Sequence, residues 1–122
     1  MFLRGIRGAI TVKRNEETEI LEATRQLLDA IVAENGIKPE DIAGVFITVT
    51  HDLDAAFPAK AIREMKGWEM VPLMCSLEIP VKGSLPLCIR FMVMVNTDLA
   101  QEQVRHVYLN DAVKLRPDLS RS

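Results

Sequence analysis

The stretch Leu85-Pro86-Leu87-Cys88-Ile89-Arg90-Phe91-Met92-Val93-Met94-Val95 reads as a largely buried β-strand with one charged residue, Arg90, near its centre. A guanidinium group stays protonated in proteins, so burial cannot make it neutral. Burying it without a partner costs several kcal/mol. We therefore expect an anionic group to face Arg90, either a protein carboxylate or a ligand.

A carboxylate interrupts the apolar segment that precedes this strand, because Glu78 lies within residues 74–79. One interpretation is a structural ion pair, in which Glu78 and Arg90 meet across the sheet from strands joined through the turn at residues 83–84. That pair does not account for Arg7, another arginine among strand residues. The second interpretation is a net positive pocket for a small polyanion, since arginine binds carboxylates in a bidentate way. The residues alone leave both open.

The flanking segments predict an α/β fold, an α+β sandwich in which a mixed sheet carries helices on one face. Helices are expected at residues 16–34 and 57–65, with a last helical turn at 111–115. Strands are expected at residues 2–12, 42–50, 68–79, 85–95 and 105–109. Residues 1–122 form one domain in this prediction, with residues 118–122 as a loose tail.

The helix at residues 16–34 carries an apolar stripe at helical spacing. Asn15 is its expected N-cap, and Gly36 is its expected C-terminal stop. In the second helix, Lys60 and Arg63 are three residues apart and share a face. That face is either solvated or anion-binding.

The composition argues against a nucleic-acid-binding protein. The chain has 122 residues, of which 48% are hydrophobic and 26% charged, as is usual for a globular domain. Its net charge is -2, so it has no overall positive electrostatic field to attract nucleic acid. Only 5% of its residues are aromatic, so it has few side chains on which bases could stack. No apolar run approaches the roughly 20 residues of a membrane span, and no signal-peptide pattern follows the N-terminus. We expect a cytoplasmic protein without a membrane partner.

Motifs for nucleophilic, nucleotide-dependent and metal-dependent chemistry are missing from the sequence. There is no GxSxG, P-loop or GxGxxG pattern. Cys75 and Cys88 form no CxxC motif, and with His51 and His106 they give no zinc-site spacing. We predict two reduced thiols. Taken alone, these residues indicate a small α/β domain with an arginine-rich anion site.

Several segments, which together cover nearly the whole chain in order, resemble one family. They are Arg4-Gly5-Ile6-Arg7-Gly8-Ala9, Phe57-Pro58-Ala59-Lys60-Ala61, the Cys75 and Glu78 pair, Cys88-Ile89-Arg90, Arg105-His106-Val107-Tyr108-Leu109 and Leu115-Arg116-Pro117-Asp118-Leu119. On these residues the chain resembles the monofunctional, trimeric bacterial chorismate mutases.

The resemblance implies an isomerase that converts chorismate to prephenate on the route to phenylalanine and tyrosine. It implies a homotrimer that forms a pseudo α/β barrel with active sites between subunits, and it implies neither a metal nor an organic cofactor. The reaction is an intramolecular Claisen rearrangement, so it requires no nucleophile. The enzyme must hold a flexible dianion in its compact conformer and stabilise the charge that develops on the ether oxygen.

The resemblance also implies roles for particular residues. Arg90 would face the ether oxygen, Arg7 and Tyr108 would hold a carboxylate, and Glu78 and Cys75 would contact the ring hydroxyl. The neighbouring subunit would supply Phe57, Ala59, Lys60 and Arg63. Further pocket residues would be Leu73, Met74, Leu115 and Arg116, the last two near the mouth.

One geometric difficulty concerns Cys75 and Glu78, which face opposite sides of an ideal strand. If both are to reach one ligand, the strand must bulge or end between them. Two alternatives to the mutase assignment remain. They are the enamine/imine deaminases, which are small trimers of similar fold, and a non-catalytic trimer that binds a small anion.

Overall fold

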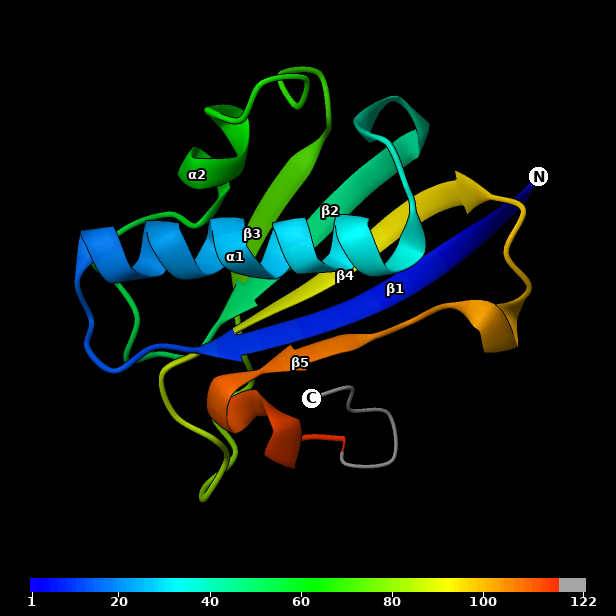
Figure 1. The fold of residues 1–122 in the computed structure, drawn as a ribbon. Coiled ribbons are helices and arrows are strands. Elements are labelled where there is room, and N and C mark those ends of the chain that lie inside the picture. The colour runs from blue at the N-terminus through cyan, green and yellow to red at the C-terminus, as the bar shows by residue number, and fades with distance from the viewer. Residues whose placement is uncertain (117–122) are drawn as a thin grey trace.

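A five-stranded mixed sheet forms the centre of the fold, as the sequence predicted (Figure 1). In the computed structural model, which describes residues 1–116, its strand order is β3-β2-β4-β1-β5. The central strand β4 runs antiparallel to β1 and β2, whereas β2 pairs with β3 and β1 with β5 in parallel. The strands are β1 (Phe2–Thr11), β2 (Ile42–Val49), β3 (Leu73–Leu77), β4 (Cys88–Thr97) and β5 (Val107–Leu109). The tail predicted at residues 118–122 lies outside the described residues.

Both α-helices cover the same face of the sheet (Figure 1). They are α1 (Glu17–Asn35) and α2 (Ala59–Arg63), and short 3-10 turns occupy Pro39–Asp41, Gln101–Gln103 and Asn110–Lys114. The apolar stripe of α1 packs against alternate residues of β1, β2 and β4 to form the main core. Gly8 permits this packing, because a Cβ at that position would lie 2.6 Å from Ile31 Cδ1. The predicted sandwich with helices on one face is confirmed.

The opposite face of the sheet, called the open face below, carries no helix (Figure 1). Side chains alternate between the two faces along a strand, so neighbouring residues have opposite environments. In β2, Ile47 is 1% exposed beneath the helices and Phe46 is 53% exposed on the open face. In β4, Phe91 is buried and Met92 is exposed in the same way. The open face is therefore partly apolar and uncovered within one subunit.

Three predicted strands begin later than the sequence indicated, and for residues 105–109 the difference is small, since β5 begins at Val107. The segment predicted as a strand over residues 68–79 contains β3 only from Leu73, because Trp68 and Val71 are buried in successive turns. The segment at residues 85–95 becomes a strand only at Cys88. Leu87 adopts a left-handed backbone with φ 52°, and its N–H donates to the Asp52 carboxylate instead of to a strand. Apolar residues in turns thus gave a false strand signal.

The start of α1 also differs from the prediction. The N-cap is Glu16, which makes no side-chain capping bond, and not Asn15. The Asn15 side chain instead bonds the loop before α2: its Nδ2 donates to Asp54 at 2.7 Å, and its Oδ1 accepts from the Ala55 N–H at 3.0 Å. Asn15 therefore ties the start of α1 to the loop that leads into α2.

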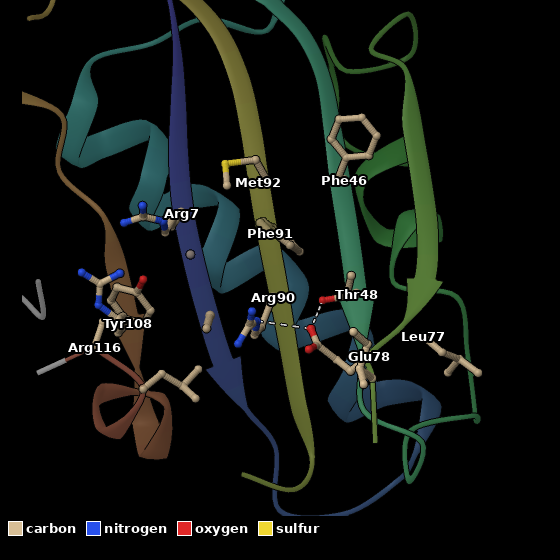
Figure 2. A pocket seen from close by; sticks show the side chains of 14 residues that line it. Arg7, Phe46, Thr48, Leu77, Glu78, Arg90, Phe91, Met92, Tyr108 and Arg116 are labelled. Atoms are coloured by element: carbon tan, nitrogen blue, oxygen red, sulfur yellow. Dashed lines mark hydrogen bonds and ion pairs between the residues drawn. The ribbon is translucent and has the colours of Figure 1, made fainter. Parts of the chain in front are cut away.

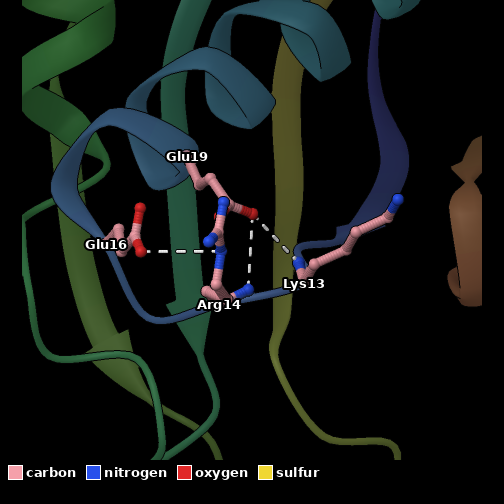
Figure 3. Close-up of polar contacts among 4 residues, drawn as sticks. All are labelled: Lys13, Arg14, Glu16 and Glu19. Carbon is pink, nitrogen blue, oxygen red and sulfur yellow. Dashed lines mark hydrogen bonds and ion pairs between the residues drawn. The ribbon is translucent and has the colours of Figure 1, made fainter.

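A carboxylate in the first turn of α1 accepts hydrogen bonds from the residues that precede the helix (Figure 3). Glu19 accepts bonds from the Lys13 and Arg14 N–H groups at 3.2 and 3.3 Å and from Arg14 Nε at 2.9 Å. The hydrogen bond from the Arg14 side chain lowers the pKa of Glu19.

Gly36 ends the helix in a left-handed conformation with φ 60°, as predicted. Across residues 1–116, no helix is long and apolar enough to cross a membrane.

Candidate active site

A pocket of about 480 Å³ lies on the open face, and it is called the open-face pocket below (Figure 2). It extends from β5 and the following turn across β1 and β4 to the ends of β2 and β3. Six of the predicted site residues line it: Arg7, Glu78, Arg90, Tyr108, Leu115 and Arg116. Residues up to 109 positions apart in the sequence (Arg7 to Arg116) thus meet at one surface.

The strand register explains why these side chains converge. Arg90 of β4 pairs with Ala9 of β1 on one side and with Thr48 of β2 on the other. Ala9 in turn pairs with Tyr108 of β5, so one row of side chains crosses the sheet. Because Ala9 is small, it leaves space on the open face between Arg90 and Tyr108. Arg7 lies two residues before Ala9 on the same face and adds a second guanidinium.

Arg90 forms an ion pair with Glu78, in which Nε and Oε2 are 3.2 Å apart. The expectation that Arg90 is buried is wrong, because its side chain is 49% exposed. Side chains of β4 alternate between the two faces of the sheet, and Arg90 lies on the open face, which no helix covers. In the single subunit, Arg90 therefore has no large desolvation cost that an ion pair must offset. The ion pair and the open pocket coexist. Neither of the two interpretations from the sequence therefore excludes the other.

The two partners of this ion pair are not on neighbouring strands. Strand β2 separates β3 from β4, and Glu78 follows directly after β3, where its N–H donates to the Val49 carbonyl at 2.9 Å. The Glu78 carboxylate reaches past Thr48 of β2, whose hydroxyl donates to Glu78 Oε2 (Figure 2). Thr48 was not among the site residues predicted from the sequence. A polar residue at an alternating position of an otherwise apolar strand was the available signal.

A second pocket, of about 550 Å³, lies at the edge strand β3 beside α2, and it is called the edge pocket below. Four predicted residues line it: Phe57, Lys60, Arg63 and Cys75. Lys60 and Arg63 share one face of α2, as predicted, and Lys60 Nζ lies 3.7 Å from Glu17 Oε2. This pocket combines two cations with an apolar wall, because the Phe57 side chain is largely exposed to it.

Strand β3 ends at Leu77, between Cys75 and Glu78, which is one of the two arrangements that a shared ligand requires. Within a single subunit, Cys75 lines the edge pocket and Glu78, just after the strand, lines the open-face pocket. Leu73 and Met74 line a third, apolar cavity of about 380 Å³. Ala59 is 4% exposed and belongs to the core, so its methyl group is not available to a ligand in this subunit.

Cys88 lies beneath the open-face pocket, in a small apolar cluster with Ala9, Tyr108 and Ala112. Burial raises the pKa of its thiol to about 12, with smaller contributions in the same direction from Glu78 and Asp52, while Arg90 lowers it. A protonated thiol is a poor nucleophile. Cys88 therefore serves as packing under the pocket. Both cysteines are free thiols, as predicted.

Comparisons with known proteins agree with this geometry. The family described as chorismate mutase type I matches residues 3–119. The chain is 55% identical to the chorismate mutase AroH of Bacillus subtilis (strain 168) over 120 residues, which cover 98% of this chain and 94% of that protein. It is 52% identical to the chorismate mutase AroH of Thermus thermophilus over 119 residues, which cover 97% of each. A solved chorismate mutase from Clostridium thermocellum matches with a TM-score of 0.86 at 51% identity, covering 88% of this chain and 96% of that one.

These similarities extend over nearly the whole chain and confirm the resemblance inferred from its motifs. They set aside the enamine/imine deaminase and non-catalytic alternatives, because every one of these relatives is a chorismate mutase. The chain belongs to the chorismate mutase type I family, and the protein is an isomerase.

Proposed function

We propose that this chorismate mutase converts chorismate to prephenate in clefts that form between the subunits of a homotrimer. One observation carries the proposal: ten of the thirteen predicted site residues fall into two pockets on different surfaces of one subunit, six in the open-face pocket and four in the edge pocket. Neither pocket contains the whole set. A complete site requires the open-face pocket of one subunit to meet the edge pocket of its neighbour.

The apolar residues of the open face support this assembly. Phe46, Met74 and Met92 lie exposed on it, and Leu77 and Ile79 continue the apolar surface to the end of β3. An exposed apolar surface of this kind is typical of a subunit interface. Two different surfaces that meet make a head-to-tail contact, and such contacts close into a ring when the rotation allows it. A closed trimer then contains identical clefts, one at each interface.

The chemistry of the reaction fits the side chains of these pockets. Chorismate is a flexible dianion, and its Claisen rearrangement breaks a C–O bond and forms a C–C bond within one molecule. The reaction therefore needs a compact conformer and positive charge near the ether oxygen, and it needs no covalent intermediate. Arg7 and Arg90 from one subunit, with Lys60 and Arg63 from the next, would surround the dianion with four cations.

Arg90 would stabilise the transition state. Its side chain lines the open-face pocket, where Nε is paired with Glu78 Oε2. The other N–H groups of the fork would donate to the ether oxygen and to a substrate carboxylate. A donor that is already oriented costs no reorganisation when charge develops, and removing one typically costs about 2.7–4 kcal/mol.

The remaining residues would orient the substrate. Arg7 and Tyr108 would bind one carboxylate, and Glu78 would accept a hydrogen bond from the ring hydroxyl. In the neighbouring subunit, Cys75 would approach that hydroxyl from the edge pocket, and Phe57 would form an apolar wall. Leu115 and Arg116 would lie at the mouth of the cleft. The absence of a cofactor and the cytoplasmic location stay predictions from the sequence.

Subunit mixing tests the shared cleft. Arg90→Ala removes a group from the open-face pocket, and Arg63→Ala removes one from the edge pocket, so each variant alone should be impaired. After subunit exchange at a 1:1 ratio, roughly one quarter of the clefts would receive both intact halves. Chorismate consumption, followed by loss of its absorbance with prephenate identified as the product, should rise accordingly.

The matched control for this experiment is a mixture of Arg90→Ala and Arg7→Ala subunits. Both substitutions lie in the open-face pocket, so no cleft in any mixed trimer is complete and no activity should return. If the Arg90→Ala and Arg63→Ala mixture stays at the level of its parents after exchange is verified by mass spectrometry, the cleft is not shared between subunits.

A further inference from the structure

Thr48 is a polar residue of the open-face pocket that none of the proposed roles includes. It lies opposite Arg90 in the register of β2 with β4. Its hydroxyl donates a hydrogen bond to Glu78 Oε2 (Figure 2). The same oxygen lies 3.2 Å from Arg90 Nε. One oxygen of the Glu78 carboxylate therefore has two protein partners, and both come from one cross-sheet row.

The backbone of Glu78 is held by separate contacts. Its N–H donates to the Val49 carbonyl at 2.9 Å, and its carbonyl oxygen lies 3.0 Å from His51 Nε2. These contacts locate the main chain but leave the side-chain torsions free. Among residues 1–116, the side chains that form a hydrogen bond or an ion pair with the Glu78 carboxylate are those of Thr48 and Arg90. Of these two partners, Thr48 is the uncharged one, and its hydrogen bond restricts the rotation of the Glu78 carboxylate.

We propose that Thr48 is a positioning residue for the rearrangement, because its hydroxyl fixes the Glu78 carboxylate with Oε2 on Arg90 and Oε1 free for the ring hydroxyl of chorismate. This inference rests on the role of Glu78 in the proposed function. The last torsion of a glutamate side chain is broad, so without this bond the carboxylate can rotate. It can then bind the Arg90 fork through both oxygens, as carboxylates do with arginine. That arrangement draws the guanidinium away from the ether oxygen.

Thr48→Val tests the inference, because valine keeps the branched shape that a strand favours and replaces the hydroxyl with a methyl group, which cannot form the hydrogen bond. We expect kcat to fall roughly 10-fold, as for the loss of a bond to a charged group, with little change in KM. Thr48→Ser should recover most of the lost kcat. Thr48→Ala, which adds no bulk, should behave like the valine variant and serves if valine disturbs the fold.

A double-mutant cycle separates positioning from a structural role. In a Glu78→Ala background, Thr48→Val should have no further effect on kcat, because the group it orients is gone. Thr97→Val is the matched control: it lies at the far end of β4, where its hydroxyl accepts from the Leu99 N–H at 3.3 Å, and it should keep wild-type kcat.

Three results would overturn the inference. Wild-type kcat in Thr48→Val, together with a loss in Glu78→Ala, removes the role of Thr48 and leaves the proposed role of Glu78 intact. An equal loss from Thr48→Val in both backgrounds shows that Thr48 does not act through Glu78. Wild-type kcat in Glu78→Ala contradicts the proposed role of Glu78, and the inference fails with it.

Discussion

The two faces of the sheet are made by the same strands, yet they differ in almost every respect. Along β4, Ile89, Phe91, Val93 and Val95 are buried beneath α1 and belong to one continuous core. Arg90 and Met92, which alternate with them, lie exposed on the open face. The helices of the chain cover the first face, whereas the second stays open and is the face that we propose binds a ligand and a neighbouring subunit. In the proposed function, stability and catalysis therefore depend on opposite faces of the sheet, because side chains alternate between the faces along each strand.

Arg90→Ala is the strongest test of this separation. It removes a side chain from the exposed face only, so we expect kcat to fall by at least about 10²–10³, with the fold and the assembly retained. Steady-state kinetics with chorismate and the molar mass in solution give the two readouts. Arg90→Lys is the control, since it keeps the charge but not the fork and should retain part of kcat. Near-normal kcat in a folded Arg90→Ala assembly would refute the mechanism.

The neighbours Ile47 and Phe46 give the same comparison in terms of stability. Ile47→Ala leaves a cavity under the helices and should lower the free energy of unfolding by about 2–5 kcal/mol. Phe46→Ala leaves no cavity within the subunit, because the side chain is exposed. We expect it to weaken association instead, which sedimentation over a range of protein concentrations would detect. A Phe46→Ala variant with unaltered assembly would show that this part of the open face is not an interface.

Cys88 is expected to make the stability of the folded protein depend on pH. Its pKa is raised from 9.0 to about 12 in the folded protein, so the folded state keeps a proton that the unfolded state loses above pH 9. The resulting stabilisation is present below the unfolded pKa and is lost as the pH rises towards the folded one. We expect the free energy of unfolding of the wild type to fall more steeply between pH 9 and 12 than that of Cys88→Ala, as measured by urea titration. Parallel pH profiles would show that the thiol is not desolvated.

Glu19 carries the smallest expected effect, because it lies away from both the main core and the pockets. Hydrogen bonding from Arg14 lowers its pKa, so its stabilisation is present above the unfolded pKa and disappears as the pH falls through the folded one. Glu19→Gln should lower Tm slightly at pH 7, and the difference should shrink in acid. Glu22→Gln, on the exposed side of α1, is the control and should leave Tm unchanged. Equal shifts in the two variants would mean that the bonds in Figure 3 do not stabilise the fold.

Much of the secondary structure was predictable because its signals are local. The stripe of α1, its stop at Gly36 and the alternation of β1 each depend on residues close in the sequence. The errors arose where distant residues compete. Asn15 bonds the loop at Asp54 instead of capping its own helix, and Trp68 is buried in a turn that resembles a strand in composition. Local patterns do not report such tertiary contacts.

The sequence by itself determined the family, the reaction class and the identity of the charged residues, because these follow from which side chains are present and in what order. Only the tertiary structure decided how they are distributed. Strand order places β2 between Glu78 and Arg90, and thereby brings in Thr48. Alternation sends Cys75 and Glu78 to different pockets. The physical reason is that pairing between strands and the choice of face depend on contacts across the whole chain, which no local window of sequence contains.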